Sequence, residues 1–167
     1  MSVFDARFHQ GKVFLPEGAF NADGPFPLRY ALDFLLVANY LARHEGMLLH
    51  ATAVRDGGQG IVFCGASGSG KSTMAELWRA EDGVQVLNHD VVALRRHGDG
   101  DFVVYGTPWW TEDPALCSPL GAPIRAIYFL AHGLENRLNP LSRSEAVANL
   151  VAECVSPVFY DAGLTAD

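Results

Sequence analysis

The sequence is short of lysine and of positive charge in general. Lys12 and Lys71 are the only lysines among 167 residues, and 12 basic side chains stand against 19 acidic ones, which gives a net charge of −7. Proteins that bind nucleic acids hold the phosphates with clustered Lys and Arg side chains. The acidic balance therefore argues against a nucleic-acid partner.

Cysteine is also scarce, and its spacing suggests no structural role. Cys64, Cys117 and Cys154 are odd in number and far apart, and no Cys-x-x-Cys pair occurs. This pattern argues against a disulfide framework and against the common zinc sites. It predicts a reducing, cytoplasmic location.

Long apolar runs are missing as well. Residues 1–12 carry charges and have no apolar centre, so they do not resemble a signal peptide. The most apolar stretch, residues 30–42, contains Asp33 and Asn39 and is too short to cross a bilayer. We expect no membrane partner, and a length of 167 residues predicts a single domain, 1–167.

One segment carries a specific chemical signal. Residues 65–72, Gly-Ala-Ser-Gly-Ser-Gly-Lys-Ser, match the pattern Gly-x-x-x-x-Gly-Lys-Ser/Thr of the phosphate-binding P-loop. The apolar run 60–64 before it predicts a buried strand, and residues 73–78 after it predict the first turns of a helix. This order of strand, loop and helix is the context in which a P-loop works.

The motif gives each of its residues an expected role. The glycines let backbone N–H groups converge on an anion, and the helix N-terminus adds about half a positive charge there. Lys71 is expected to reach the β- and γ-phosphates, and the Ser72 hydroxyl to bind Mg²⁺. We predict that a nucleoside triphosphate, ATP, is bound by Gly65, Ala66, Ser67, Gly68, Ser69, Gly70, Lys71, Ser72 and Thr73.

The rest of the chain predicts a mixture of strands and helices. Residues 1–26 contain two weak strand signals and a loop, and a helix is expected from about 27 to 44. Two apolar runs, 47–55 and 60–64, flank Asp56-Gly57-Gly58 and predict a hairpin that leads into the P-loop. Later strands are expected at 84–87, 90–96, 102–105 and 125–131, and a capping box at 142–145 predicts a helix to about residue 154.

Other side chains are candidates for chemistry beyond phosphate binding. Asp90 follows the strand expected at 84–87, where a carboxylate could hold Mg²⁺ or accept a proton from an attacking hydroxyl. His50 lies in an apolar strand, a pattern that by itself favours a core residue. His89 could carry a proton or contact phosphate, and Trp109-Trp110 could stack a base, line a peptide groove or pack in the core.

The ordered set of His50, hairpin, P-loop and His89-Asp90 resembles the catalytic domain of HPr kinase/phosphorylase. It is more similar to the small HPr-kinase-like proteins of bacterial peptide-modification clusters, over about residues 47–155. The resemblance implies an α/β fold, a single P-loop domain with a mixed sheet related to that of phosphoenolpyruvate carboxykinase. It also implies that His50 is an active-site histidine and that Asp90 is a base and metal ligand. His89 stands where the family has a further acidic residue.

Together these observations predict an ATP- and Mg²⁺-dependent kinase that phosphorylates a serine hydroxyl on a peptide or small protein. Asp90, His50 and Lys71 are the expected catalytic residues, and Ser72 and Asp90 the expected metal ligands. We expect no separate N-terminal domain like that of the classical enzyme, so HPr itself is not an expected substrate. A small-molecule kinase, a non-catalytic nucleotide-binding module and an oligomer stay open. The ending 163–167 predicts a chain shortened before a further helix.

Overall fold

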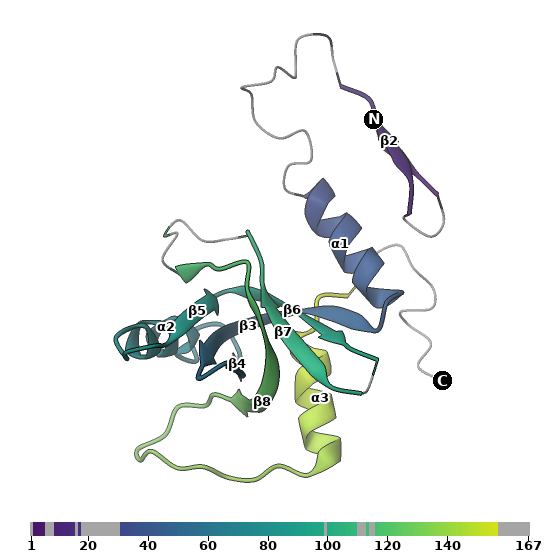
Figure 1. Ribbon diagram of the computed structural model, residues 1–167. Coiled ribbons are helices and arrows are strands. Elements are labelled where there is room, and N and C mark those ends of the chain that lie inside the picture. Colours follow the sequence, from purple (N-terminus) through teal and green to yellow (C-terminus); the bar gives the residue numbers. More distant parts are fainter. Residues whose placement is uncertain are drawn as a thin grey trace. The chain divides into compact units, whose positions relative to one another are not determined.

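The structure is a computed structural model that describes residues 2–5, 9–15, 17, 31–98, 100–109, 113 and 116–156 (Figure 1). Its contacts divide the chain into two compact units, Met1–Glu45 with Ser156–Asp167 and Gly46–Val155. The expected ending at 163–167 and the beginning of the helix expected from residue 27 lie outside the described residues.

The first unit contains a short hairpin and one helix. β1 (Ser2–Phe4) pairs antiparallel with β2 (Gly11–Val13), and α1 spans Leu32–Ala42. Nδ2 of the buried Asn39 side chain donates to the Leu35 carbonyl oxygen at 2.7 Å, and its buried Oδ1 forms no hydrogen bond with any described residue. Among the helices of the described residues, none has the length and apolar character needed to cross a membrane.

The second unit is built on a sheet that closes on itself. Its strands are β3 (Gly46–Asp56), β4 (Gln59–Cys64), β5 (Gln85–Asn88), β6 (Val91–Arg96), β7 (Phe102–Gly106) and β8 (Gly121–Phe129). Five strands form a ring in the order β4–β8–β7–β6–β3, with β3 paired again to β4, and β5 extends along β3. All neighbours are antiparallel except β4 and β8, which are parallel.

This closure shows that the expected fold class is wrong. The resemblance implied a mixed sheet of the HPr kinase and phosphoenolpyruvate carboxykinase kind, whereas the described residues form a small closed five-stranded barrel with three helices. The hairpin leading into the P-loop is confirmed, because β3 and β4 pair antiparallel with Asp56 opposite Gln59. Local apolar patterns identify single strands, but the ring depends on pairing of β4 with β8 and of β3 with β6. These partners are distant in sequence.

Alternation along β3 and β4 gives the sheet two different faces. One core cluster takes side chains from one face, including Leu49, Ala51, Ala53, Val62 and Cys64. A second cluster takes Val54, Ile61 and Phe63 from the other face, together with Ala75 of α2 (Lys71–Arg79). Residues two apart in a strand point the same way, so His50 and Thr52 share the α2 face with Val54.

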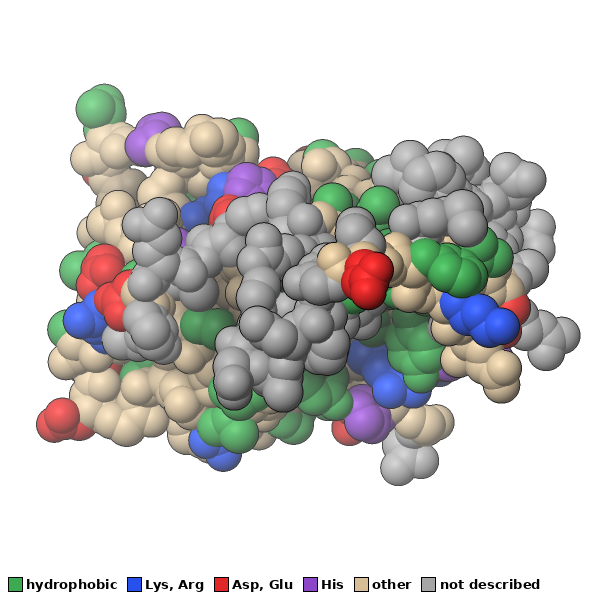
Figure 2. All heavy atoms as spheres, turned by 90° about the horizontal axis from the view of Figure 1, so that it is seen from above, with side chains coloured by type: hydrophobic (Ala, Val, Ile, Leu, Met, Phe, Trp, Pro, Cys, Tyr) green, Lys and Arg blue, Asp and Glu red, His purple; other side chains and the backbone are tan. Residues whose placement is uncertain are grey.

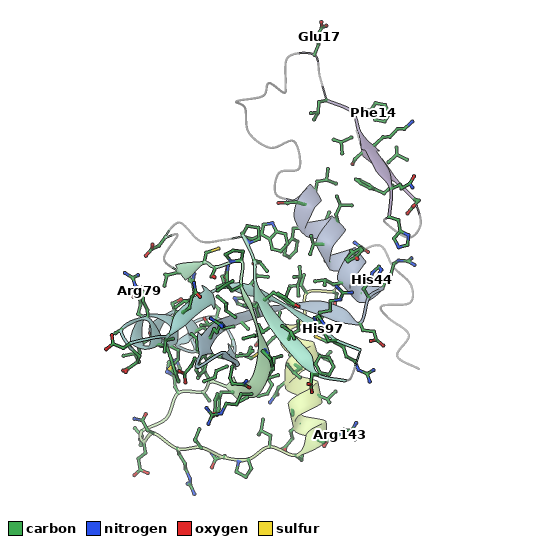
Figure 3. The ribbon with its side chains drawn as sticks, in the orientation of Figure 1. Phe14, Glu17, His44, Arg79, His97 and Arg143 are labelled. Atoms are coloured by element: carbon green, nitrogen blue, oxygen red, sulfur yellow. The ribbon has the colours of Figure 1, made fainter. Side chains whose placement is uncertain are left out.

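Helix α2 contacts β3 and β5 on this face (Figure 1). Its last turn carries Arg79, which is labelled in Figure 3. The Arg79 Nη1 atom lies 2.9 Å from Asp113 Oδ2 and 3.7 Å from Glu76 Oε2. The exposed pair with Asp113 connects the end of α2 to the segment that follows β7, whereas the pair with Glu76 lies within α2.

Helix α3 (Arg143–Glu153) begins at the predicted capping box. The Ser142 hydroxyl accepts from the Glu145 N–H at 3.3 Å, and the Glu145 carboxylate accepts from the Ser142 N–H at 2.9 Å. The Ser142 hydroxyl also donates to Glu145 Oε2 at 2.6 Å. This hydrogen bond, followed by the one from the Ser142 N–H, lowers the pKa of the Glu145 carboxyl. Before α3 the chain runs away from the sheet through residues 131–141, all of which are exposed (Figure 1). Leu130, directly before this segment, is half-buried.

Charged side chains of both signs are interspersed over the described part of the face in Figure 2. Basic side chains on this face are separated from one another by acidic and uncharged ones. The chain has 19 acidic and 12 basic residues in all.

Gly106, at the end of β7, leaves no room for a side chain. A Cβ atom here would collide with the carbonyl oxygens of Ser118 and Leu87. We expect Gly106→Ala to lower the free energy of unfolding by about 2 kcal/mol, as overpacking does in tight interiors. Urea denaturation would measure the loss, with Gly98→Ala as the control because a Cβ at Gly98 meets no atom within 4 Å. Equal stability of the two variants would contradict this account.

Candidate functional site

The segment 65–72 forms a tight loop between β4 and α2. Gly65, Gly68 and Gly70 have φ angles of 150°, 80° and 103°, a region that glycine adopts without strain. A Cβ on Gly65 would meet the Ser69 hydroxyl oxygen at 2.6 Å, whereas Gly68 and Gly70 would meet no atom within 4 Å. Strand, loop and helix therefore follow one another as the motif predicts, with open space above two of its glycines.

The first turn of α2 keeps its backbone donors available. Gly70 is the N-cap, in a left-handed conformation, and no side chain of the described residues caps the helix. The first helical hydrogen bond runs from the Met74 N–H to the Gly70 carbonyl at 2.9 Å. The N–H groups of residues 71–73 thus lie at the uncapped end, where an anion can accept from them. Ser72 and Thr73 are exposed there.

Lys71 is buried and turned into its own loop. Its side chain is 6% exposed, and Nζ donates to the carbonyl oxygens of Gly65 at 2.5 Å and Ala66 at 3.2 Å. His132, which follows β8, contacts the Gly68 carbonyl oxygen through Nε2 at 2.9 Å. Three loop carbonyls are thus engaged by Lys71 and His132. Lys71 Nζ would therefore have to leave these carbonyls to contact an anion at the first turn of α2.

The second part of the site is a break in the sheet. β5 and β6 follow each other beside β3 and are separated by His89 and Asp90. The buried Asn88 side chain bridges the break, because its Oδ1 accepts from the N–H of Asp90 at 2.7 Å and of Val91 at 3.0 Å. Its Nδ2 donates to the Thr107 carbonyl at 2.8 Å. Asp90 is therefore presented from a fixed turn.

Thr52 joins the loop to this break. Its side chain is buried on β3, and its hydroxyl lies 3.1 Å from the Lys71 carbonyl oxygen and 3.0 Å from the His89 carbonyl oxygen. Ser72 follows Lys71 in the chain, and Asp90 follows His89. One hydroxyl thus lies between the backbone segments beside both predicted metal ligands, and its single proton is shared between the two carbonyls or donated to one of them at a time.

His50 and Asp90, the two predicted catalytic residues outside the loop, are 40 residues apart in the sequence but lie in contact. The His50 Nε2 atom is 3.0 Å from Asp90 Oδ1, and its Nδ1 atom is 3.5 Å from Glu153 Oε2 at the end of α3. The side chains of His50, Asp90 and Glu153 are 40%, 35% and 15% exposed. His50 is therefore a partly exposed member of a polar cluster, not the core residue that its strand pattern favoured.

The remaining candidates lie around the break. The half-buried His89 ring has a buried Nδ1 atom that forms no hydrogen bond with any described residue. Trp109 is buried, and its carbonyl oxygen accepts from Asn88 Nδ2 at 3.2 Å, which favours packing over base stacking. Trp110 lies outside the described residues.

A comparison with protein families assigns the chain. A family model described as SynChlorMet cassette protein ScmC matches residues 28–164, which is most of the sequence. The chain belongs to the ScmC family. A search of curated proteins gave no match. The region matched by ScmC contains the loop 65–73 and the cluster of His50, Asp90 and Glu153.

Three residues of this site, Thr52, Asn88 and Glu153, were missed from the sequence alone, and all of them lie in the region that the ScmC model matches. Thr52 is hidden in an apolar strand, where a threonine is an ordinary β-branched residue. Asn88 stands two residues before Asp90, a spacing typical of an Asx turn, so a signal for it was present. Glu153 ends a helix with a carboxylate, which is unfavourable next to the helix dipole and is itself a signal.

Cys64 ends β4 directly before the loop and is fully buried. Burial, together with the Glu153 carboxylate, raises the pKa of its thiol from 9.0 to about 12, against the lowering effect of Lys71. Above pH 9 the unfolded chain releases this proton while the folded chain keeps it, so stability falls as pH rises from 9 toward 12. We expect a loss of about 1 kcal/mol per pH unit from this group.

Urea unfolding at several pH values between about 8 and 10.5 would measure the slope. In Cys64→Ala the decline should be shallower than in the parent chain. Identical slopes in the two proteins would show that the Cys64 thiol titrates as it does in the unfolded chain.

Proposed function

We propose that this chain is an ATP- and Mg²⁺-dependent kinase that phosphorylates a serine hydroxyl on a peptide or small protein. The observation that carries the proposal is the Thr52 hydroxyl, 3.1 Å and 3.0 Å from the carbonyl oxygens of Lys71 and His89. Through this contact the phosphate-binding loop is held next to the pair of His50 and Asp90. Phosphoryl transfer requires a phosphate cradle and a group that orients and deprotonates the acceptor at one place.

The loop and the first turn of α2 would hold the triphosphate. The uncapped N–H groups of residues 71–73 and the open space at Gly68 and Gly70 suit an anion. Lys71 is the single lysine of the second unit and would move from the loop carbonyls to the β- and γ-phosphates. Its charge then stabilises the phosphates where negative charge develops.

Ser72 and Asp90 would hold Mg²⁺ together with the substrate phosphates. Both supply oxygen atoms, which Mg²⁺ prefers, and Mg²⁺ sites commonly use one or two carboxylates plus phosphates. Ser72 is exposed and Asp90 half-buried, and the carbonyl oxygen preceding each lies within hydrogen-bond distance of the Thr52 hydroxyl. These observations fit such an ion, which when bound supplies positive charge against the transferring phosphoryl group.

Asp90 would accept the proton of the serine hydroxyl while the serine oxygen forms a bond to the γ-phosphorus. The bond from that phosphorus to the β,γ-bridging oxygen breaks, and ADP is the leaving group. His50, 3.0 Å from Asp90, orients the carboxylate for this role. Most of the rate enhancement would come from positioning and from charge stabilisation.

All three cysteines are free thiols. Free thiols persist in reducing compartments, whereas oxidising compartments favour disulfides. We therefore assign the reaction to the cytoplasm.

Transfer of ³²P from γ-labelled ATP tests the proposal directly. The full chain with Mg²⁺ would be offered a library of serine-containing peptides, alongside a reaction without acceptor. We expect label on serine that depends on the peptide. ATP binding without transfer or hydrolysis would overturn the kinase assignment.

A non-catalytic nucleotide-binding module is the second candidate. Lys71 and His132 both engage loop carbonyls, and His89 stands in the place of an acidic residue of the resembled family. If this candidate is correct, the chain binds ATP without turnover. Gain of transfer activity in His89→Asp would then support a lost metal ligand as the cause.

A further inference from the structure

We propose that Glu153 is a positioning residue, which fixes the ring of His50 and through it the carboxylate of Asp90. Its consequence for catalysis rests on the kinase function proposed above. The contact itself does not depend on that function. Glu153 lies outside every motif of the sequence, and three independent observations support its role.

The first observation is the contact. His50 lies between two carboxylates, with Nδ1 3.5 Å from Glu153 Oε2 and Nε2 3.0 Å from Asp90 Oδ1. An imidazole ring that has a partner at one nitrogen presents the other nitrogen in a defined direction. Without a partner at Nδ1, the His50 ring can rotate and exchange the two nitrogens in front of Asp90. Glu153 therefore selects which nitrogen Asp90 meets.

The second observation is the anchoring of the chain around Glu153. Immediately after α3, Cys154 forms an antiparallel bridge with Leu49, and the Val155 N–H donates to the Leu48 carbonyl at 2.9 Å. Leu48 and Leu49 directly precede His50 on β3 and are among the most buried side chains of the barrel. The end of α3 is therefore joined by backbone contacts to the strand that carries His50, which keeps Glu153 at a fixed place beside the ring.

The third observation is that a glutamate at the end of α3 is unfavourable for the helix itself. A carboxylate in the last turn of a helix is repelled by the negative end of the helix dipole. Glu153 is also only 15% exposed, and it ends the half-buried stripe of Ala146 and Leu150 on α3. Burying a charge costs free energy unless a partner compensates. His50 is the partner that the structure provides, so its contact accounts for this residue.

Kinetics in a double-mutant cycle test the role in catalysis. We expect Glu153→Ala to lower kcat about 10-fold, within the roughly 2- to 150-fold range that contacting pairs show, and to leave KM for ATP unchanged. In a His50→Ala background the same change should alter kcat less than twofold, because residues that act as one unit are not additive. Glu153→Gln should recover most of the activity, and the exposed Glu135→Ala serves as control. Independent, multiplying effects of Glu153 and His50 would overturn the proposal.

NMR of the His50 ring tests the contact without any need for activity. Side-chain ¹⁵N–¹H correlations of the nucleotide-free chain, assigned with His50→Ala, report the surroundings of both ring nitrogens. Glu153→Ala should shift these resonances, whereas Glu135→Ala should leave them in place. Unchanged His50 resonances in folded Glu153→Ala would overturn the positioning role. Shifted resonances in a chain without kinase activity would support the positioning role and reject the proposed function.

Discussion

Replacing Lys71 with alanine should reduce phosphoryl transfer by roughly 10³-fold, the loss expected for one main stabiliser of transition-state charge. The reason is local: Lys71 is the single lysine of the second unit, and its Nζ lies within the loop, bonded to Gly65 and Ala66. The chain should stay folded, because these partners are loop carbonyls and the two core clusters do not include Lys71.

The ³²P assay measures the loss, and urea denaturation checks the fold. Lys12→Ala is the matched control, because Lys12 is the other lysine of the chain and lies exposed on β2 of the first unit. Its activity should equal that of the parent chain. Full activity in Lys71→Ala would disprove the role given to the loop.

Replacing Asp90 with asparagine should reduce kcat by about 10²- to 10⁴-fold, the usual contribution of general acid–base catalysis. The amide keeps the size of the carboxylate and leaves the backbone turn intact, because Asn88 bonds the Asp90 N–H and not its side chain. Binding of ATP without Mg²⁺ should change little, since the loop and the start of α2 are untouched.

Single-turnover transfer and calorimetric ATP binding separate the two effects. Asp82→Asn is the control, an exposed aspartate in the turn after α2. A variant that loses Mg²⁺-dependent ATP binding but keeps its rate at saturation would restrict Asp90 to a metal ligand. The proton would then have another acceptor.

Local features of this fold could be predicted from the sequence. The Asp56-Gly57-Gly58 turn, the capping box at Ser142 and the strand before the loop are set by residues close together, and each is present as predicted. Strand β8 was expected from residue 125 but begins at Gly121. Pro123 pairs with Val103 within it, although proline is uncommon inside a strand.

The closure of the barrel could not be predicted from the sequence in this way. β3 pairs with β6 through its first half and with β4 and β5 through its second half. Apolar alternation shows that a strand is buried but not which partner covers each edge. The resemblance supplied a fold class instead, and that fold class was wrong.

The candidate site also contains residues that the sequence could predict and residues that it could not. Residues of the loop and Asp90 carry a sequence pattern, and Asn88 has the spacing of an Asx turn. Thr52 and Glu153, by contrast, act through contacts between distant segments. His50 needed a resemblance to be singled out, because its strand neighbours Leu49 and Ala51 are core residues and suggest the same for it. The contact with Asp90 at 3.0 Å replaces that interpretation.

The parallel pairing of β4 with β8 has a consequence for the order of events during synthesis. β4 leaves the ribosome about 60 residues before β8, which at 5–20 residues per second is a delay of roughly 3–12 seconds. During this time the apolar strand Gln59–Cys64 has a partner on one edge, β3, and the edge that later pairs with β8 is bare. The nascent chain should therefore gain protease resistance late, in one step, once Phe129 has emerged and Leu130 can donate to the Cys64 carbonyl.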